Sequence, residues 1–231
     1  MIALALALLV QPVAERQLML TGFDRVRVDG PFTVTIATGG SAGARVTGAP
    51  AALEMVTLRV EGGVLVIAPA RDDRGRPRGG PAPVVTVHAG RVAGLAIRGG
   101  GTVRIDRMVA PRVDLSLTGD GAVEVGAIDA GQLDLRLIGA GSATLAGRAG
   151  QARVLVNGAA GVAADGLRLD ELVAQSSGTG QARYRVRYAA DISASGSGSV
   201  TVAGGARCRT RGTATIRCAS EPQAGSRAIT G

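Results

Sequence analysis

A short glycine turn recurs at nearly constant spacing through the second half of the chain. It reads RGGGTVRI, TGDGAVEV, IGAGSATL and NGAAGVAA in the first four copies, and SGTGQARY, SGSGSVTV and RGTATIRC in the last three. The first glycines of these copies are Gly99, Gly119, Gly139, Gly158, Gly178, Gly196 and Gly212. They are separated by 20, 20, 19, 20, 18 and 16 residues. So regular a period indicates a repeat architecture in which each copy is one structural unit.

Apolar and polar side chains alternate on both sides of each turn. Before the second copy, Val113, Leu115 and Leu117 alternate with Asp114 and Ser116, and the same alternation precedes the third copy. A period of two places one set of side chains on a buried face and the other set in water. Each unit is therefore predicted to be a strand, a glycine turn, a second strand and a looser corner.

Two all-β architectures fit such a unit. In a parallel β-solenoid each unit is one coil, and in a meander each glycine turn closes an antiparallel hairpin. Stacked coils set equivalent positions above one another, which explains why the spacing is kept, whereas hairpins do not require it. Twenty residues at ~3.3 Å each give a coil perimeter of ~66 Å. The sequence thus favours a parallel β-solenoid with coils of about 20 residues.

The remainder of the chain sets the domain boundaries. Residues 1–14 form a short apolar run, MIALALALLVQPVA, typical of a signal peptide, with a buried first strand as the alternative. Residues 21–218 are predicted to be one solenoid domain, with further strands and one helical turn near 50–55 before the repeat. A charged, proline-rich surface loop is expected at 69–83, and residues 219–231 are expected to be a disordered tail. After removal of the signal peptide we expect no integral membrane segment.

The chain is basic, with 26 Lys and Arg against 18 Asp and Glu and a formal net charge of +8. All of this positive charge is arginine, and most of it is scattered. Only 2% of the residues are aromatic, so the stacking platforms of nucleic-acid-binding proteins are missing. We therefore expect no nucleic-acid partner, while arginine-mediated binding of anionic envelope polymers stays open.

The usual catalytic and cofactor signatures are not found. His88 is the single histidine and lies among valines, so no histidine pair exists for a zinc site. A Ser-His-Asp triad would have to use His88, and a lone histidine among valines is typical of a structural residue rather than a catalytic base. The glycine turns are followed by strands rather than helices, unlike dinucleotide-binding loops. We accordingly predict no catalytic residue, no cofactor and no metal.

One acidic pair deserves a separate hypothesis. Asp114 and Asp134 each lie five residues before a turn glycine, so they would stack outward on adjacent coils. Such a pair could hold calcium or serve a polysaccharide lyase or hydrolase. Because Arg136 and Arg153 lie near the same positions, an exposed ion-pair network is the simpler interpretation.

The order of these features resembles the GIN domain family, described as a head domain of autotransporter adhesins. The resemblance is carried by the opening FDRVRVDGPFTVTIATG, by VEGGVLVIAP, and by the serial turns TGDG, SGTG and SGSG. It covers roughly residues 22–218, although the fourth copy has one extra residue and the last has lost its second glycine. It implies a right-handed parallel β-helix in exported bacterial envelope proteins.

The two cysteines occupy inward positions on opposite arms of the last turn. Cys208 lies four residues before Gly212, and Cys218 lies six residues after it. In an exported protein such a pair is expected to form a disulfide, with free buried thiols as the alternative. The bond would hold the terminal coil, which lacks a neighbour on one side.

The sequence as a whole predicts a non-enzymatic structural or adhesin-like module of the bacterial envelope, located in the periplasm or at the cell surface. Its expected partner is an envelope or surface ligand, either protein or polysaccharide. The alternative function is a carbohydrate-active β-helix enzyme that uses Asp114 and Asp134.

Overall fold

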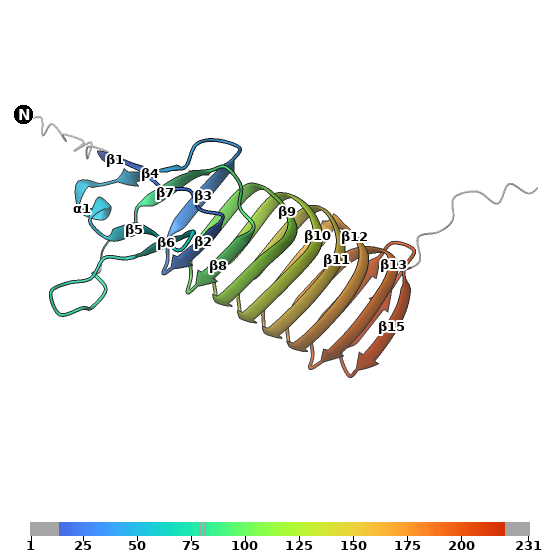
Figure 1. The fold of residues 1–231 in the computed structure, drawn as a ribbon. Helices are drawn as coiled ribbons and strands as arrows, with labels where there is room; N and C mark the ends of the chain where they lie inside the picture. Colours follow the sequence, from blue (N-terminus) through green and yellow to red (C-terminus); the bar gives the residue numbers. More distant parts are fainter. Residues whose placement is uncertain (1–13, 79, 81, 220–231) are drawn as a thin grey trace, which may run out of the picture.

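The fold is that of a computed structural model, which describes residues 14–78, 80 and 82–219 (Figure 1). The predicted signal peptide and tail, at 1–14 and 219–231, lie outside the described residues except for Ala14 and Ala219. Nearly every described element is a β-strand, and the strands join into one sheet of 16 strands that winds along the stack.

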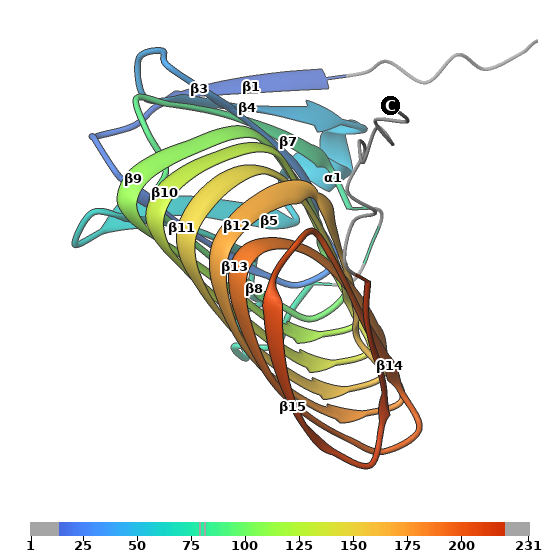
Figure 2. The ribbon, with the colours of Figure 1, turned by 90° about the vertical axis from the view of Figure 1, so that its right-hand side faces the viewer.

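The glycine repeats form parallel coils, as the sequence predicted. Four long strands each span almost a whole coil: β9 (Thr102–Gly119), β10 (Ala122–Gly139), β11 (Ser142–Gly158) and β12 (Gly161–Gly178). They pair in parallel, and the turn glycines Gly119, Gly139, Gly158 and Gly178 are in register with one another. Figure 2 shows these coils one behind another. The meander alternative is wrong, because no pair of these strands is antiparallel.

The stack continues on both sides of these four coils. On the C-terminal side are β13 (Gln181–Ser195), β14 (Ser199–Ala203), β15 (Arg207–Gly212) and β16 (Thr215–Cys218). On the N-terminal side, β2 (Arg25–Asp29) and β8 (Gly94–Arg98) pair in parallel and lead into β9, as does β3 (Thr33–Thr38).

Antiparallel strands close the N-terminal end, where the colours run from blue to teal in Figure 1. There β4 (Gly43–Gly48) pairs with both β1 (Ala14–Met19) and β7 (Val84–Ala89). A hairpin of β5 (Val56–Glu61) and β6 (Val64–Pro69) lies beside β2, after the short helix α1 (Pro50–Leu53). The helical turn was expected, whereas β1 was not.

The corner of each coil is more regular than predicted. Strand pairing continues through it, for example between Arg107 and Ala127 and between Val109 and Asp129. Register shifts do occur there, between Val125 and Ile128 against β11. In β9 to β13 the corner is therefore a bend with bulges within a long strand, whereas in the last coil a short turn at 204–206 separates β14 from β15.

The core is a set of aliphatic ladders inside the coils. Leu115, Leu135, Val154, Ala174 and Ile192 are successive partners on β9 to β13, and all five are buried. Burying one Leu or Val side chain stabilises a fold by about 1.5–3 kcal/mol, so the repeat of this position stabilises every coil against the next. The inward set predicted from period-two alternation is thus confirmed.

The turn glycines allow this close stacking. All seven markers have positive φ, between 97° at Gly99 and 134° at Gly178. At Gly119 a Cβ atom would lie 2.8 Å from the carbonyl oxygen of Gly99 on the preceding coil. That same oxygen accepts a hydrogen bond from the Gly121 amide at 3.0 Å. Glycine is required here both for its backbone conformation and for the space it leaves.

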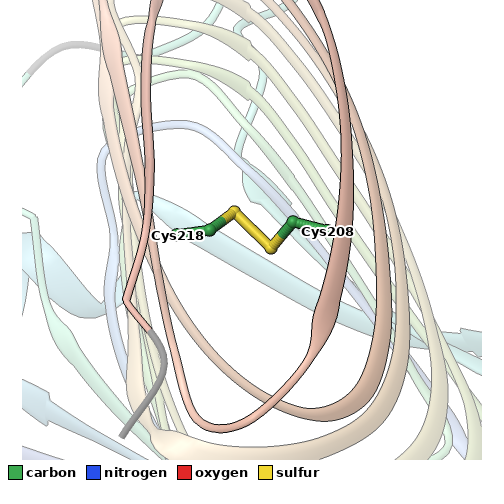
Figure 3. The surroundings of a disulfide bond; sticks show 2 residues. All are labelled: Cys208 and Cys218. Atoms are coloured by element: carbon green, nitrogen blue, oxygen red, sulfur yellow. A yellow bond between two sulfur atoms is a disulfide. The ribbon is translucent and has the colours of Figure 1, made fainter.

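A disulfide joins Cys208 and Cys218 across the last coil (Figure 3). The two Cα atoms are 6.6 Å apart. The cysteines stack on the inward residues Ala190 and Val202 of the coil below. Cys208 is half-buried and Cys218 is exposed, because no described coil covers them.

Replacement of Gly119 by alanine should weaken the stack. We expect Gly119→Ala to lower the free energy of unfolding by about 1–3 kcal/mol, because the new Cβ is strained by the positive φ and meets the Gly99 carbonyl. Denaturant unfolding monitored by circular dichroism measures the effect. Gly40→Ala is the control: a Cβ there meets nothing within 4 Å, and the change should be below about 0.5 kcal/mol. Equal losses in both variants would contradict the role of the turn glycines.

Removal of the disulfide should loosen the terminal coil. In the chain-entropy model a bridge over so short a loop contributes about 3 kcal/mol. Because each coil contacts only its neighbours, we expect the double variant Cys208→Ser, Cys218→Ser to exchange amide hydrogens faster in β15 and β16 but not in β9. Hydrogen-exchange mass spectrometry measures both regions in one experiment. Two alkylatable thiols in the native, unreduced protein would contradict the bond.

Candidate functional site

Each coil presents three outward surfaces, which come from the two arms of the coil and its corner. We call them the first sheet, the corner side and the second sheet. On β10 they correspond to residues 122–125, 127–132 and 133–138, and the other coils follow in register. The candidate sites lie on the second sheet and on the corner side.

Asp114 and Asp134 stack on the second sheet, as the sequence predicted. They are direct partners on β9 and β10. Asp134 is only 8% exposed and is the one charged residue among the described residues that is buried, whereas Asp114 is half-buried. The pair lines a shallow pocket of about 240 Å³, together with Arg25, Arg27 and Arg136.

One guanidinium group joins the two carboxylates. Arg112 Nη2 lies 2.7 Å from Asp134 Oδ2, and Arg112 Nε lies 3.3 Å from Asp114 Oδ1. The contact to Asp134 is an ion pair without hydrogen-bond alignment, so that oxygen has no hydrogen-bond donor among the described residues. The expectation that Arg136 and Arg153 neutralise the pair is wrong. Arg112, at the end of the corner, reaches both carboxylates because they are stacked at adjacent strands.

This geometry does not favour acid–base or metal chemistry. A glycosidase needs one carboxyl group kept protonated and a second one ionised, on opposite sides of the scissile bond, whereas both aspartates here face the same cation. A bound guanidinium also repels a metal cation. Within the described residues no group of three or more His, Cys, Asp and Glu side chains could hold a metal ion. His88 lies apart on β7, in register with Ala37 and Gly43.

A second candidate site, which we call the basic groove, lies on the corner side between β10 and β14. It measures about 560 Å³, and Arg148, Arg168, Arg185 and Arg187 line it. Two of these arginines are exposed partners of each other, Arg168 on β12 and Arg185 on β13, and Arg148 precedes them on β11. The groove also contains the carboxylates of Asp129 and Asp170.

Asp129 closes one end of the basic groove by pairing with Arg148. Arg148 donates two hydrogen bonds to this carboxylate, from Nε to Oδ1 at 2.9 Å and from Nη2 to Oδ2 at 2.7 Å. The hydrogen bond from Arg148 lowers the pKa of Asp129, and the same bond raises the pKa of Arg148. Such a bidentate pair holds the guanidinium plane in a fixed orientation.

At the other end, the guanidinium of Arg187 lies over the ring of Tyr188, 4.6 Å from its centroid. Attraction of the cation to the face of the ring limits the positions that this side chain adopts. The sequence analysis missed the groove because it treated the arginines as scattered. Asp129, Arg148, Arg168 and Arg185 are in fact 19, 20 and 17 residues apart, close to the spacing of the turn glycines. That shared period was the available signal.

Stacked parallel coils with a closed antiparallel end define a β-solenoid, and comparisons with known proteins place it in a family. The chain belongs to the family described as "Putative auto-transporter adhesin, head GIN domain", whose model matches residues 22–206. The family resemblance drawn from the sequence is thereby confirmed. No curated protein matches this chain.

Solved structures share the fold at low sequence identity. A putative adhesin from Bacteroides fragilis superposes with a TM-score of 0.82 at 19% identity, over 90% of this chain and 98% of its own. A putative adhesin from Parabacteroides distasonis gives 0.69 at 16%, over 91% and 98%. A putative lipid binding protein from the same species gives 0.71 at 16%, over 90% and 96%. These similarities support the fold and extend over nearly the whole of each chain.

The described part of the chain contains no helix of the length and apolarity that crossing a bilayer requires.

The contacts of Arg112 with Asp114 and Asp134 should stabilise the fold more than an exposed ion pair does. Arg112→Ala should lower the free energy of unfolding by about 1–3 kcal/mol, because Asp134 would stay largely buried without its cation. Arg104→Ala is the matched control: it breaks an exposed pair with Glu124, at 2.8 Å, and should cost less than about 1 kcal/mol. Adding Asp134→Asn to Arg112→Ala should restore part of the loss. Equal urea midpoints for the two single variants would contradict the network.

Proposed function

We propose that this protein is an exported, non-enzymatic adhesin-like module of the bacterial envelope. The family and the fold support an adhesin-like structural module. The observation that carries the proposal is the architecture itself: coils whose arms stack in register present long, rigid outward surfaces to a partner. A rigid surface loses little conformational entropy on binding, which suits attachment to a repetitive ligand.

Export is supported by two independent features. The disulfide between Cys208 and Cys218 is of the kind that persists in oxidising compartments outside the cytoplasm. The apolar run at residues 1–14 has the length and composition of a signal-peptide core. We place the protein in the periplasm or at the cell surface, with a protein or polysaccharide of the envelope as its partner.

The non-enzymatic part of the proposal rests on the acidic pair. Asp114 and Asp134 share the Arg112 cation, so each carboxylate already has an arginine partner. A polysaccharide lyase or hydrolase that uses them is the competing function, and one assay separates the two.

Beads coated with the purified, oxidised chain should be retained on a surface that carries envelope polysaccharide or protein, without release of reducing ends or unsaturated sugars. Beads coated with the reduced, denatured chain are the control, because they carry the same charge without the ordered surfaces. Retention is counted by microscopy, and released sugar is measured in the supernatant. Failure of retention on every coated surface would contradict the adhesin-like role. Sugar release that Asp134→Asn abolishes would establish the enzyme instead.

A further inference from the structure

The basic groove is unusual in how its charges are stacked. On the rest of the solenoid, charged side chains on adjacent coils are mostly paired with the opposite charge, and the stacked Asp114 and Asp134 share Arg112. Examples are Arg104 with Glu124, Arg183 with Asp165, and Arg209 with Asp191. Such pairs follow the rule that opposite charges on neighbouring strands stabilise a sheet and like charges destabilise it.

In the basic groove three arginines follow one another on the same ladder. Arg148 is the partner of Arg168, and Arg168 is the partner of Arg185. No other ladder among the described strands carries three consecutive side chains of one charge. Asp129 pairs with Arg148 at one end, and Arg168 has no ion-pair partner within the described residues. Arg168 therefore lies between two other arginines without a carboxylate of its own among the described residues, and an anion placed beside it removes the repulsion that it experiences.

The spacing of these cations indicates an extended ligand. Partner strands lie ~4.8 Å apart, so the three backbone positions span ~10 Å along the solenoid axis. A guanidinium group presents a planar fork of donors that matches a carboxylate or a sulfate with two hydrogen bonds. A sugar ring in an extended chain advances by nearly the same distance as one coil. A chain with one acidic group on each sugar would therefore meet one arginine per residue.

The shape of the groove agrees with such a ligand. Its volume of about 560 Å³ falls within the range of small-ligand sites, ~300–1,000 Å³. Gly150, Gly204 and Gly205 lie along it, and their lack of side chains leaves the backbone open to a chain lying across the coils. No aromatic residue is among the described residues that line the groove, and the ring of the neighbouring Tyr188 is covered by Arg187. Single-stranded nucleic acids rely on free aromatic faces for stacking, so they fit this surface less well.

We infer that the basic groove binds a linear acidic polysaccharide, with Arg148, Arg168 and Arg185 each contacting a carboxylate or sulfate of successive sugars. Arg148 would use its Nη1 donors for this contact, because its Nε and Nη2 donate to Asp129. Arg187 contributes a fourth positive charge beside the ladder. The inference rests on the proposed adhesin-like function, for which it names a ligand class and a binding surface. It needs neither export nor attachment to cells in order to be tested.

The test measures binding of short oligosaccharides to the purified, oxidised full chain by isothermal titration calorimetry. The probes are a tetrasaccharide of galacturonic acid, a sulfated heparin tetrasaccharide, a neutral dextran oligomer and single-stranded oligothymidylate. We expect both acidic sugars to bind, the neutral one not to bind, and the affinity to fall as salt is raised. The stronger of the two acidic probes identifies carboxylate or sulfate as the preferred group.

Two arginine variants on separate surfaces provide the matched comparison. Arg168→Gln should weaken binding of the acidic sugars about tenfold, the equivalent of ~1.4 kcal/mol. Arg153→Gln removes the same charge from the exposed second sheet and should change affinity less than about twofold. Gly205→Gln fills the groove without altering charge, in a position where a Cβ meets nothing within 4 Å, and should also weaken binding.

Equal effects of Arg168→Gln and Arg153→Gln would show attraction to the net charge alone and would overturn the inference. Tighter binding of oligothymidylate than of either acidic sugar would overturn it as well. If neither sugar binds while coated beads still adhere, the groove is not the adhesive site and the proposed function stands. If the sugars bind and the beads fail to adhere, the proposed function fails and the binding site stands.

Discussion

Close contact between the backbones of successive coils at the glycine turns is the constraint on which the rest of the structure depends. Gly99, Gly119 and Gly139 lie over one another, and a Cβ at Gly119 would meet backbone atoms of Gly99. Because the turns cannot slide past one another without losing this fit, every coil enters its next strand in the same register. The inward and outward sets of side chains follow from that register alone, since a shift by one residue would exchange them.

Because the register is fixed, each residue contacts the residues at the same position on the coils above and below it. An aliphatic residue at an inward position packs on its counterparts above and below, and Leu115 on Leu135 is one example. An outward charge is likewise placed ~4.8 Å from whatever occupies the same position on the next coil. On the first and second sheets, charges that are brought close together in this way have opposite sign, or a bridging arginine such as Arg112 lies between them. Register shifts occur on the corner side, and this is also where a run of like charge is found.

Period alone was enough to predict most of the solenoid, and its failures have definite physical causes. The parallel coils, the inward ladders and the positions of Cys208 and Cys218 all follow from the spacing of the turns. The strand at the start, β1, could not be found in this way, because it pairs with β4 through long-range antiparallel contacts outside the repeat. The role of Arg112 was not predicted either, because it depends on how the Arg112 side chain extends from the corner toward Asp114 and Asp134. Arg148, Arg168 and Arg185 could have been recognised, because they share the period of the turns.

The unpaired strand edges at the two ends of the stack are protected in different ways. At the N-terminal end, antiparallel strands and a hairpin cover the first parallel coil, so pairing changes direction and further coils cannot be added in register. At the other end, β15 and β16 each pair with one strand only, and no described strand covers their outer edges. Arg207, Arg209 and Arg211 point outward along β15, where their charges oppose the approach of a second copy of the same edge. The arginine charges on β15 oppose pairing with another strand, but they do not prevent the two arms of the last coil from separating. The disulfide provides that restraint, since it links the two arms of the coil that has a neighbour on one side.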